Sequence, residues 1–316
     1  MDRLAELRTF LAVVDQGSFA GAARNLRRSP PTITRIIAEF EGRLGVRLFD
    51  RSSRRCTPTK VARRLAEASR NLLADYDAAL GDASGQALEP RGMLRVTAPY
   101  VFGRQHVAPL ILDFVDAYPE ISCELDLSDR QLDLVEDMFD IALRIGTISD
   151  LDLVARKVGF VREVIAASPD YLRRHGEPSS PSDLQRHQII QQGPSSTRSW
   201  RLRDASGRPL TIPTRGRFTV NQADAAIAAA REGRGLVAAL SYQVFDDLKS
   251  GALALVLEQF EPEPLPVHLV WPEGRDRLLR VRMLIDYLAP RLQDLAVLRS
   301  LKLSADDRDS LPTSRG

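Results

Sequence analysis

The stretch 29–41 combines a helix start with a short polar face that carries one cation. Ser29 can serve as the N-cap, and Pro30 suits the first helical position, where its missing N–H costs nothing. Because the chain turns by about 100° per residue, several small polar residues gather on one side of this helix. Hydroxyl and guanidinium groups can hydrogen-bond to base edges in a groove of DNA, and a proline can pack against a thymine methyl group. The residues of this helix predicted to contact DNA are Pro30, Pro31, Thr32, Thr34 and Arg35.

The other side of the same helix is apolar. Its residues recur at i, i+3, i+4 and i+7, which is the spacing of a buried helical face. They are Ile33, Ile36, Ile37 and Phe40. Any amphipathic helix has this pattern, and Arg35 could instead pair with Glu39 one turn later. Such a pair contributes only about 0.2–0.5 kcal/mol, which is too little to keep Arg35 out of a groove.

Two shorter helical patterns lead into this helix. Apolar residues at helical spacing predict a first helix that ends at 16–17, and Ser18 can cap a second one. Only Arg27 and Arg28 separate the second helix from the Ser29 cap. Two helices joined so tightly, the later one with a polar outer face, are the pattern of a DNA-binding helix-turn-helix. At their helix N-termini, Ser18 and Ser29 could then donate to phosphate oxygens.

A short β-ribbon is predicted over 48–59, after Gly42 and Gly45 end the preceding helix. Three arginines lie near its tip, where they would neutralise phosphates or enter the minor groove beside the site. They are Arg51, Arg54 and Arg55.

Three segments, 17–23, 29–35 and 44–51, closely resemble the winged helix-turn-helix of LysR-type transcriptional regulators. The resemblance is highly specific over residues 1 to about 65 and continues more loosely to about residue 295. One departure follows the wing, where the family usually has Thr-Glu-Ala-Gly and this chain has Thr-Lys-Val-Ala at 59–62. An acid is replaced by a base and a glycine by alanine, which would shift the entry into the next helix slightly.

Charge is distributed unevenly along the 316 residues. Residues 1–65 hold 14 Lys and Arg against 6 Asp and Glu, a net charge of +8, whereas the remainder has a net charge of −6. A basic N-terminal part on a mildly acidic body suits a polyanion partner for that part alone. No apolar run resembles a signal peptide or a membrane span. The two cysteines, Cys56 and Cys123, fit a reducing cytoplasm, and we expect reduced thiols rather than a redox switch.

One long helix is predicted over 60–83. Its apolar residues form a narrow stripe that two helices packed together would bury, although a lone helix could also lie on its own domain. The stripe contains Val61, Leu65, Ala68, Leu72, Tyr76 and Ala79. The family resemblance favours dimerisation through this helix. Small and turn-forming residues from 81 to 92 then read as a linker.

From residue 91 onward, strand and helix patterns alternate. Their βαβαβ order predicts a parallel sheet with helices on its faces, and a second such set follows, with its regularity interrupted near Trp200. The expected strands include 141–145 and 218–220. The expected helices include 132–138, a capped one over 221–231, and one over 242–248 capped by Ser241. Two α/β lobes with a crevice between them are the architecture of periplasmic-type solute-binding proteins, which the LysR resemblance also implies.

The expected fold class is therefore α/β overall, in four parts. Residues 1–59 would form an all-α winged helix-turn-helix domain, 60–90 a linker and dimerisation helix with its hinge, and 91–300 a two-lobed effector-binding domain similar to periplasmic binding proteins. Residues 301–316 are expected to form a disordered polar tail.

Ligands of doubly wound sheets sit beyond the carboxyl ends of the strands. Helix N-termini at several of these points favour an anionic group, and the matching loops line the effector cleft in LysR-type proteins. Arg144 could anchor a carboxylate, although pairing with a nearby aspartate is the safer interpretation. The candidate effector-binding residues are Pro99, Tyr100, Val101, Ser128, Asp129, Arg144, Ile145, Gly146, Asn221 and Ser241.

Catalysis is not expected. The four histidines are scattered without metal-ligand spacing, and the sequence has no G-x-S-x-G, Walker A or G-x-G-x-x-G motif, so no metal, cofactor or catalytic residue is predicted. One rival is a solute-binding receptor without DNA binding, which the basic N-terminal part and the missing signal peptide disfavour. Another is an architectural DNA-coating protein whose cleft is filled by its own side chains. The resemblance implies a regulator that binds double-stranded DNA as a dimer or tetramer and contacts RNA polymerase.

Overall fold

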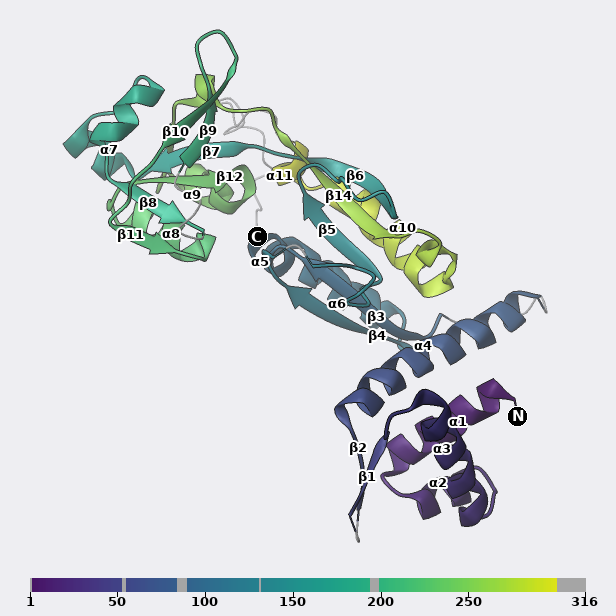
Figure 1. The fold of residues 1–316 in the computed structure, drawn as a ribbon. Coiled ribbons are helices and arrows are strands. Elements are labelled where there is room, and N and C mark those ends of the chain that lie inside the picture. Colours follow the sequence, from purple (N-terminus) through teal and green to yellow (C-terminus); the bar gives the residue numbers. More distant parts are fainter. Residues whose placement is uncertain (1, 53–54, 84–89, 131, 194–198, 300–316) are drawn as a thin grey trace, which may run out of the picture. The chain divides into compact units, whose positions relative to one another are not determined.

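The computed structural model describes residues 2–52, 55–83, 90–130, 132–193 and 199–299 (Figure 1). The chain forms two compact units. The first contains residues 1–93 with the short segments 118–122 and 278–280, and the second contains the remainder. The expected polar tail, 301–316, and residues 84–89 of the expected linker lie outside the described residues.

The first unit begins with three helices, α1 (Arg3–Gln16), α2 (Phe19–Asn25) and α3 (Pro30–Leu44). Two of them start at the predicted serine caps. The Ser18 hydroxyl accepts a hydrogen bond from the N–H of Gly21 at 3.0 Å, and the Ser29 hydroxyl accepts one from the N–H of Thr32 at 3.4 Å. These bonds satisfy N–H groups that the first helical turn leaves without a backbone acceptor.

Glycine in the left-handed conformation ends both longer helices. Gly17 follows α1 with φ of 57°, and Gly45 follows α3 with φ of 70°. Gly42, which was also expected to end α3, lies inside it. The predicted β-ribbon is present as β1 (Phe49–Ser52) paired antiparallel with β2 (Arg55–Pro58).

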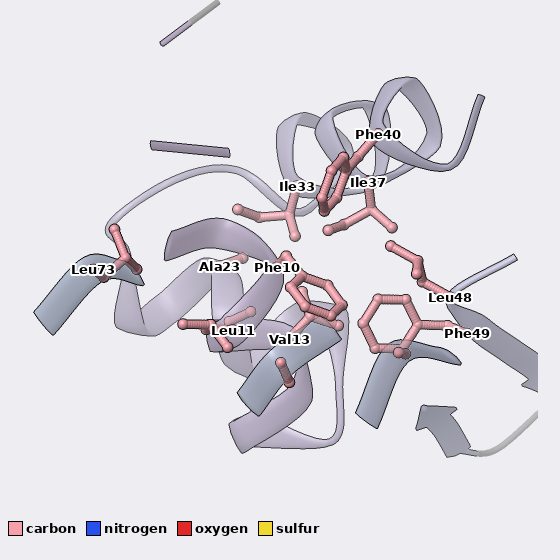
Figure 2. Packing of buried hydrophobic residues seen from close by; sticks show 13 residues of the cluster. Phe10, Leu11, Val13, Ala23, Ile33, Ile37, Phe40, Leu48, Phe49 and Leu73 are labelled. Atoms are coloured by element: carbon pink, nitrogen blue, oxygen red, sulfur yellow. The ribbon is translucent and has the colours of Figure 1, made fainter. Parts of the chain in front are cut away.

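An aromatic and aliphatic core holds the three helices and the β-ribbon together (Figure 2). The Phe10 ring on α1 lies 5.7 Å from that of Phe40 on α3 and 5.8 Å from that of Phe49 on β1. Ile33 and Ile37 from the predicted apolar face of α3 are fully buried in the same cluster. Burial of each such side chain contributes about 1.5–3 kcal/mol, so the apolar face of α3 fixes which face it leaves exposed.

The long helix is present as α4 (Lys60–Ala83), over the predicted range. A face offset from the predicted stripe packs on the core of the first unit. Its buried residues are Ala62, Ala66, Ser69 and Leu73. The stripe itself is largely exposed, with Val61, Leu72 and Tyr76 each more than 40% accessible. The helix therefore covers its own unit with one face and leaves a second apolar face open.

The first large sheet has the strand order β4-β3-β5-β14-β6. Its strands are β3 (Gly92–Ala98), β4 (Ile121–Leu127), β5 (Ile141–Ile145), β6 (Leu153–Val161) and β14 (Leu265–Pro272). Its helices are α5 (Tyr100–Phe102), a π-helical turn (Gly103–Val107), α6 (Ala108–Ala117), α10 (Leu279–Gln293) and α11 (Ala296–Arg299). This sheet and its helices form the first lobe.

The second large sheet has the order β11-β8-β12-β7-β13. Its strands are β7 (Glu163–Ala167), β8 (Ile189–Gln192), β11 (Phe218–Val220), β12 (Leu236–Leu240) and β13 (Ala254–Val256). Its helices are α7 (Pro169–His175), α8 (Ala223–Arg231) and α9 (Phe245–Ser250), and short 3-10 turns span Pro181–Arg186, Ser241–Val244 and Glu258–Phe260. Together they form the second lobe.

Both sheets are mixed, so the prediction of parallel sheets is confirmed for some strand pairs and wrong for others. β3 and β5 are parallel, as are β11, β8 and β12, but β14 is antiparallel to β5 and β7 is antiparallel to β12. The reason is that the chain passes between the lobes twice, from β6 to β7 and from β13 to β14. A strand that arrives from the other lobe starts at the edge where the parallel strands end, and it must therefore run opposite to them.

The two passages are joined by an ion pair. Arg162 lies between β6 and β7, and its Nη1 lies 3.0 Å from Oε2 of Glu261, which lies between β13 and β14. The Arg162 side chain is only 6% exposed. Buried charges persist in proteins when they are paired in this way, so the pair fixes the two passages to each other.

The expected helix over 132–138 is wrong, because a capped turn takes its place. The Asp133 carboxylate accepts hydrogen bonds from the N–H groups of Val135 and Glu136, both at 2.9 Å. Met138 then takes φ of 58°, which no helix can continue through.

The irregular region near Trp200 is a β-hairpin of β9 (Ser199–Arg203) and β10 (Pro209–Pro213). Trp200 and Leu202 alternate into the core of the second lobe, and the Asp204 carboxylate accepts the N–H groups of Ser206 and Arg208 to close the turn.

Candidate nucleic-acid interface and ligand cleft

The outer face of α3 presents the predicted polar residues around its N-terminus. Pro30, Pro31, Thr34 and Arg35 are exposed, and Thr32 is half-buried. Thr34 donates its hydroxyl proton to the Pro30 carbonyl oxygen at 3.0 Å, and the Thr32 hydroxyl lies 2.7 Å from that of Ser29. These short-range bonds hold the hydroxyls against the helix and leave lone pairs open to an external donor.

Arg35 forms the alternative pair with Glu39, at 3.1 Å between Nη1 and Oε1. Both side chains are open to water, at 67% and 48% exposed. An exposed i,i+4 pair is screened and weak, so Arg35 is available to a stronger anion such as a phosphate or to a guanine edge. The pairing and the predicted contact with DNA are therefore compatible.

The capping serines and the ribbon arginines are the other residues predicted to contact DNA. Ser18 and Ser29 use oxygen lone pairs for capping, which leaves the hydroxyl proton of Ser18 to donate outward. Arg51 and Arg55 lie on the paired strands of the ribbon, and Arg54 lies outside the described residues.

The second unit contains a cleft of about 1060 Å³ lined by both lobes. The carboxyl ends of β3, β4 and β5 form one wall, as expected for ligand sites in such sheets. Arg104 of the first lobe pairs with Asp224 of the second at 3.0 Å. Seven of the ten predicted effector-binding residues line the cleft: Pro99, Tyr100, Ser128, Asp129, Arg144, Ile145 and Asn221.

The other three predicted residues are not part of the lining. Val101 is 1% exposed and packs into the lobe, and Gly146 takes φ of 104° in the bend after β5. Ser241 was expected to cap a helix, but its hydroxyl instead accepts the N–H of Arg162 at 3.0 Å. Asn221 lines the cleft, although the N-cap of α8 is the following residue, Gln222.

Arg144 is the half-buried cation of this cleft. Its Nη2 donates to the carbonyl oxygen of Leu132 at 2.7 Å, and within the described residues we find no ion pair for it. The expected aspartate partner is therefore not what holds Arg144. Asp129 has another role, since its Oδ1 accepts the N–H of Tyr100 at 2.9 Å.

Several lining residues were missed from the sequence. They include Thr97, Arg130, Thr147, Glu163, Gln192, Gln222, Tyr242 and Gln243. The side-chain oxygen of Gln222 is buried with no hydrogen-bond partner in the described structure. Burial raises the pKa of the Tyr242 hydroxyl, which accepts a hydrogen bond from Gln243 Nε2 at 3.3 Å. Thr97 and Gln192 lie at or next to the end of a strand, so the strand pattern could have predicted them. The other residues line the cleft because of how the two lobes face each other, which the sequence does not show.

We also searched the described part of the chain for a metal site and for a membrane-spanning helix. It contains no group of three or more His, Cys, Asp and Glu side chains arranged to hold a metal ion. It also contains no helix with the length and apolar character needed to cross a membrane.

Comparison with known proteins agrees with this arrangement. Residues 4–63 match the bacterial regulatory helix-turn-helix protein, lysR family, and residues 87–293 match the LysR substrate binding domain. An HTH-type transcriptional regulator of Xanthomonas campestris pv. campestris is 33% identical over 90% of this chain and 83% of its own length. The Escherichia coli regulator DmlR is 31% identical, with 90% and 93% covered.

Solved structures show the same fold. CrgA of Neisseria meningitidis, a LysR-type transcriptional regulator, is 30% identical with a TM-score of 0.58, covering 91% of this chain and 98% of its own. The full-length virulence activator AphB of Vibrio cholerae is 27% identical with a TM-score of 0.59 and the same coverage. With both of its parts matched by family models, this chain belongs to the LysR family of transcriptional regulators, with a helix-turn-helix DNA-binding domain and a substrate-binding domain.

Proposed function

We propose that α3 reads its operator through Pro31, Thr32, Thr34 and Arg35. Ser18, Ser29 and the ribbon arginines Arg51, Arg54 and Arg55 would then contact phosphates. The observation that carries this proposal is the exposed polar face of α3, which is fixed in orientation by the buried face opposite it. An HTH dimer places two such helices in successive major grooves, about one helical turn or its multiples apart.

The test is the affinity of the full chain for a duplex selected from genomic fragments, measured by fluorescence anisotropy. Arg35→Ala should cost roughly 1–3 kcal/mol on the selected duplex and relax its sequence preference, because a base contact is lost. Arg54→Ala should weaken binding to all duplexes by the same factor, because a phosphate contact carries no sequence information. Arg70→Gln is the matched control, since Arg70 is exposed on the same unit but paired with Asp15. Unchanged binding by Arg35→Ala would show that α3 does not dock in this way.

The cleft is proposed to hold a small anionic effector. Arg144 supplies a cation without a carboxylate partner among the described residues, and a cavity of about 1060 Å³ is not filled by the chain's own side chains. This favours a ligand-controlled regulator over an architectural protein. The effector would change how subunits pack and thereby the spacing of the DNA-binding units, without any catalytic step.

Assembly is proposed to use the open face of α4, in a dimer or a dimer of dimers. Val61, Leu72, Tyr76 and Leu80 are 42–53% exposed on this helix, and two such faces packed together would bury them. We further propose a cytoplasmic protein that contacts RNA polymerase at its promoters. Analytical ultracentrifugation of Leu72→Asp should show a shift to smaller species; an unchanged distribution would place the dimer contact elsewhere.

A further inference from the structure

The turn between α2 and α3 contains a strained arginine. Arg27 has φ of 52°, one of three positive values among the described residues other than glycine. Its N–H donates to the Arg24 carbonyl oxygen at 3.2 Å, and the N–H of Arg28 donates to the Ala23 carbonyl oxygen at 2.9 Å. These bonds close the C-terminus of α2 in the arrangement that normally takes glycine, because a Cβ atom is crowded in this conformation.

The turn is also unusually cationic. Residues 16–38 contain four arginines and no aspartate or glutamate. Arg24, Arg27 and Arg28 are exposed, and we find no ion pair for any of them within the described structure. Three like charges so close together repel one another, so neither backbone geometry nor charge balance accounts for arginine at position 27.

The position of the turn suggests what the charge is for. Only Arg28 lies between Arg27 and the Ser29 cap of α3. When the N-terminal residues of a recognition helix enter the major groove, the segment just before it comes beside the phosphate backbone. A guanidinium can bind two phosphate oxygens at once, which a glycine cannot replace.

We propose that Arg27 is a phosphate-contacting residue of the helix-turn-helix, with Arg24 and Arg28 adding to the same positive surface. Strained residues are often found at functional sites. In this proposal, the strained backbone at Arg27 is retained because DNA binding requires a cation at this turn. The inference rests on DNA binding through α3, and it adds a contact outside α3 and the ribbon.

The experiment compares stability and DNA affinity in the same full-length variants. Arg27→Gly relieves the strain, so its urea midpoint should rise, yet its affinity should fall for both a selected and an unrelated duplex. The slope of log affinity against log salt concentration should become shallower by about one for each DNA-binding unit, because one phosphate contact is lost. Arg27→Lys should keep most of that slope while remaining strained.

Two further variants make the result decisive. Arg27→Asn removes the charge but tolerates a left-handed backbone, so it should weaken binding as Arg27→Gly does. Arg70→Gln removes an exposed charge elsewhere on the unit and should leave the slope unchanged. A wild-type slope in Arg27→Gly and Arg27→Asn would overturn the proposal while leaving DNA binding by α3 intact. Absence of salt-dependent binding by the wild-type chain would overturn both.

Discussion

The carboxylate of Glu6 on α1 accepts hydrogen bonds from the guanidinium of Arg43 on α3, with 3.0 Å between Nη1 and Oε1. Glu6 is 3% exposed and Arg43 is 47% exposed, so one member of the pair is buried and the other reaches it from the surface. The bond to Glu6 raises the pKa of Arg43, and the same guanidinium lies 5.2 Å from the centre of the Phe40 ring. The pair therefore links α1 to α3 through a partly buried ionic contact.

Removing the cation from this pair should destabilise the first unit. Arg43→Met leaves the Glu6 carboxylate buried without its partner, which should lower Tm by several degrees and speed hydrogen exchange in α1 and α3. The double variant Glu6→Leu with Arg43→Met should recover most of the loss, because neither charge then remains buried. This account would be contradicted if the loss of stability in the double variant equalled the sum of the losses in Glu6→Leu and Arg43→Met.

Arg144 should determine the affinity of the cleft for anions. Arg144→Met removes a charged hydrogen-bond donor, so binding of a small carboxylate should weaken by roughly 1.5–3 kcal/mol in calorimetry. Arg156→Met is a suitable control, because Arg156 is on the same sheet and pairs with Asp286 at 3.6 Å. Equal affinities of the wild type and Arg144→Met for the carboxylate would show that Arg144 does not bind the anion.

Acidification should destabilise the second unit through His106. Burial lowers the pKa of His106, with the nearby Asp246 opposing the effect in part. The folded state therefore binds a proton at His106 less readily than the unfolded state does. The stabilisation that neutral His106 provides is fully present above about pH 6.5, and it is lost as the pH falls from there through the lowered pKa of the folded state.

Urea unfolding at pH 7.5 and 5.5 tests this expectation. His106→Gln should reduce the fall in unfolding free energy between the two pH values, because the buried group that takes up a proton on unfolding is then missing. The same pH dependence in wild type and His106→Gln would place the titrating group elsewhere.

Cys123 should be chemically inert in the folded protein. Burial, together with Asp140 and Glu124, raises the pKa of this thiol to about 12. Because the thiolate is the reactive form, only about one molecule in ten thousand would be reactive at pH 8. Iodoacetamide followed by mass spectrometry should leave Cys123 unmodified until urea unfolds the chain. Rapid alkylation of the native protein would contradict this.

The first unit could be predicted from sequence almost residue by residue, because its signals are local. Ser18 and Ser29 cap helices, Gly17 and Gly45 end them, and an i, i+3, i+4, i+7 stripe fixes the buried face of α3. What the sequence did not reveal was the Glu6–Arg43 pair, whose partners are 37 positions apart.

The second unit was harder to predict because its organisation is non-local. Strand positions such as Ile141–Ile145 and Phe218–Val220 matched, yet sheet direction did not, since the order of strands alone does not show where the chain changes lobe. Many cleft residues at strand ends were found, such as Pro99, Ser128 and Ile145, although Thr97 and Gln192 were not. Gln222 and Glu163 were missed, because their place in the lining depends on the second lobe facing the first.

The double passage between the lobes has a consequence for how this protein can be divided. β14 is a central strand of the first sheet, although it is made from residues 265–272, after the entire second lobe. A chain terminated anywhere between 168 and 264 would therefore lack the middle of the lobe that was synthesised first. Nonsense mutations late in the gene should behave as complete losses of the effector domain, and the first lobe cannot be expressed as one continuous fragment.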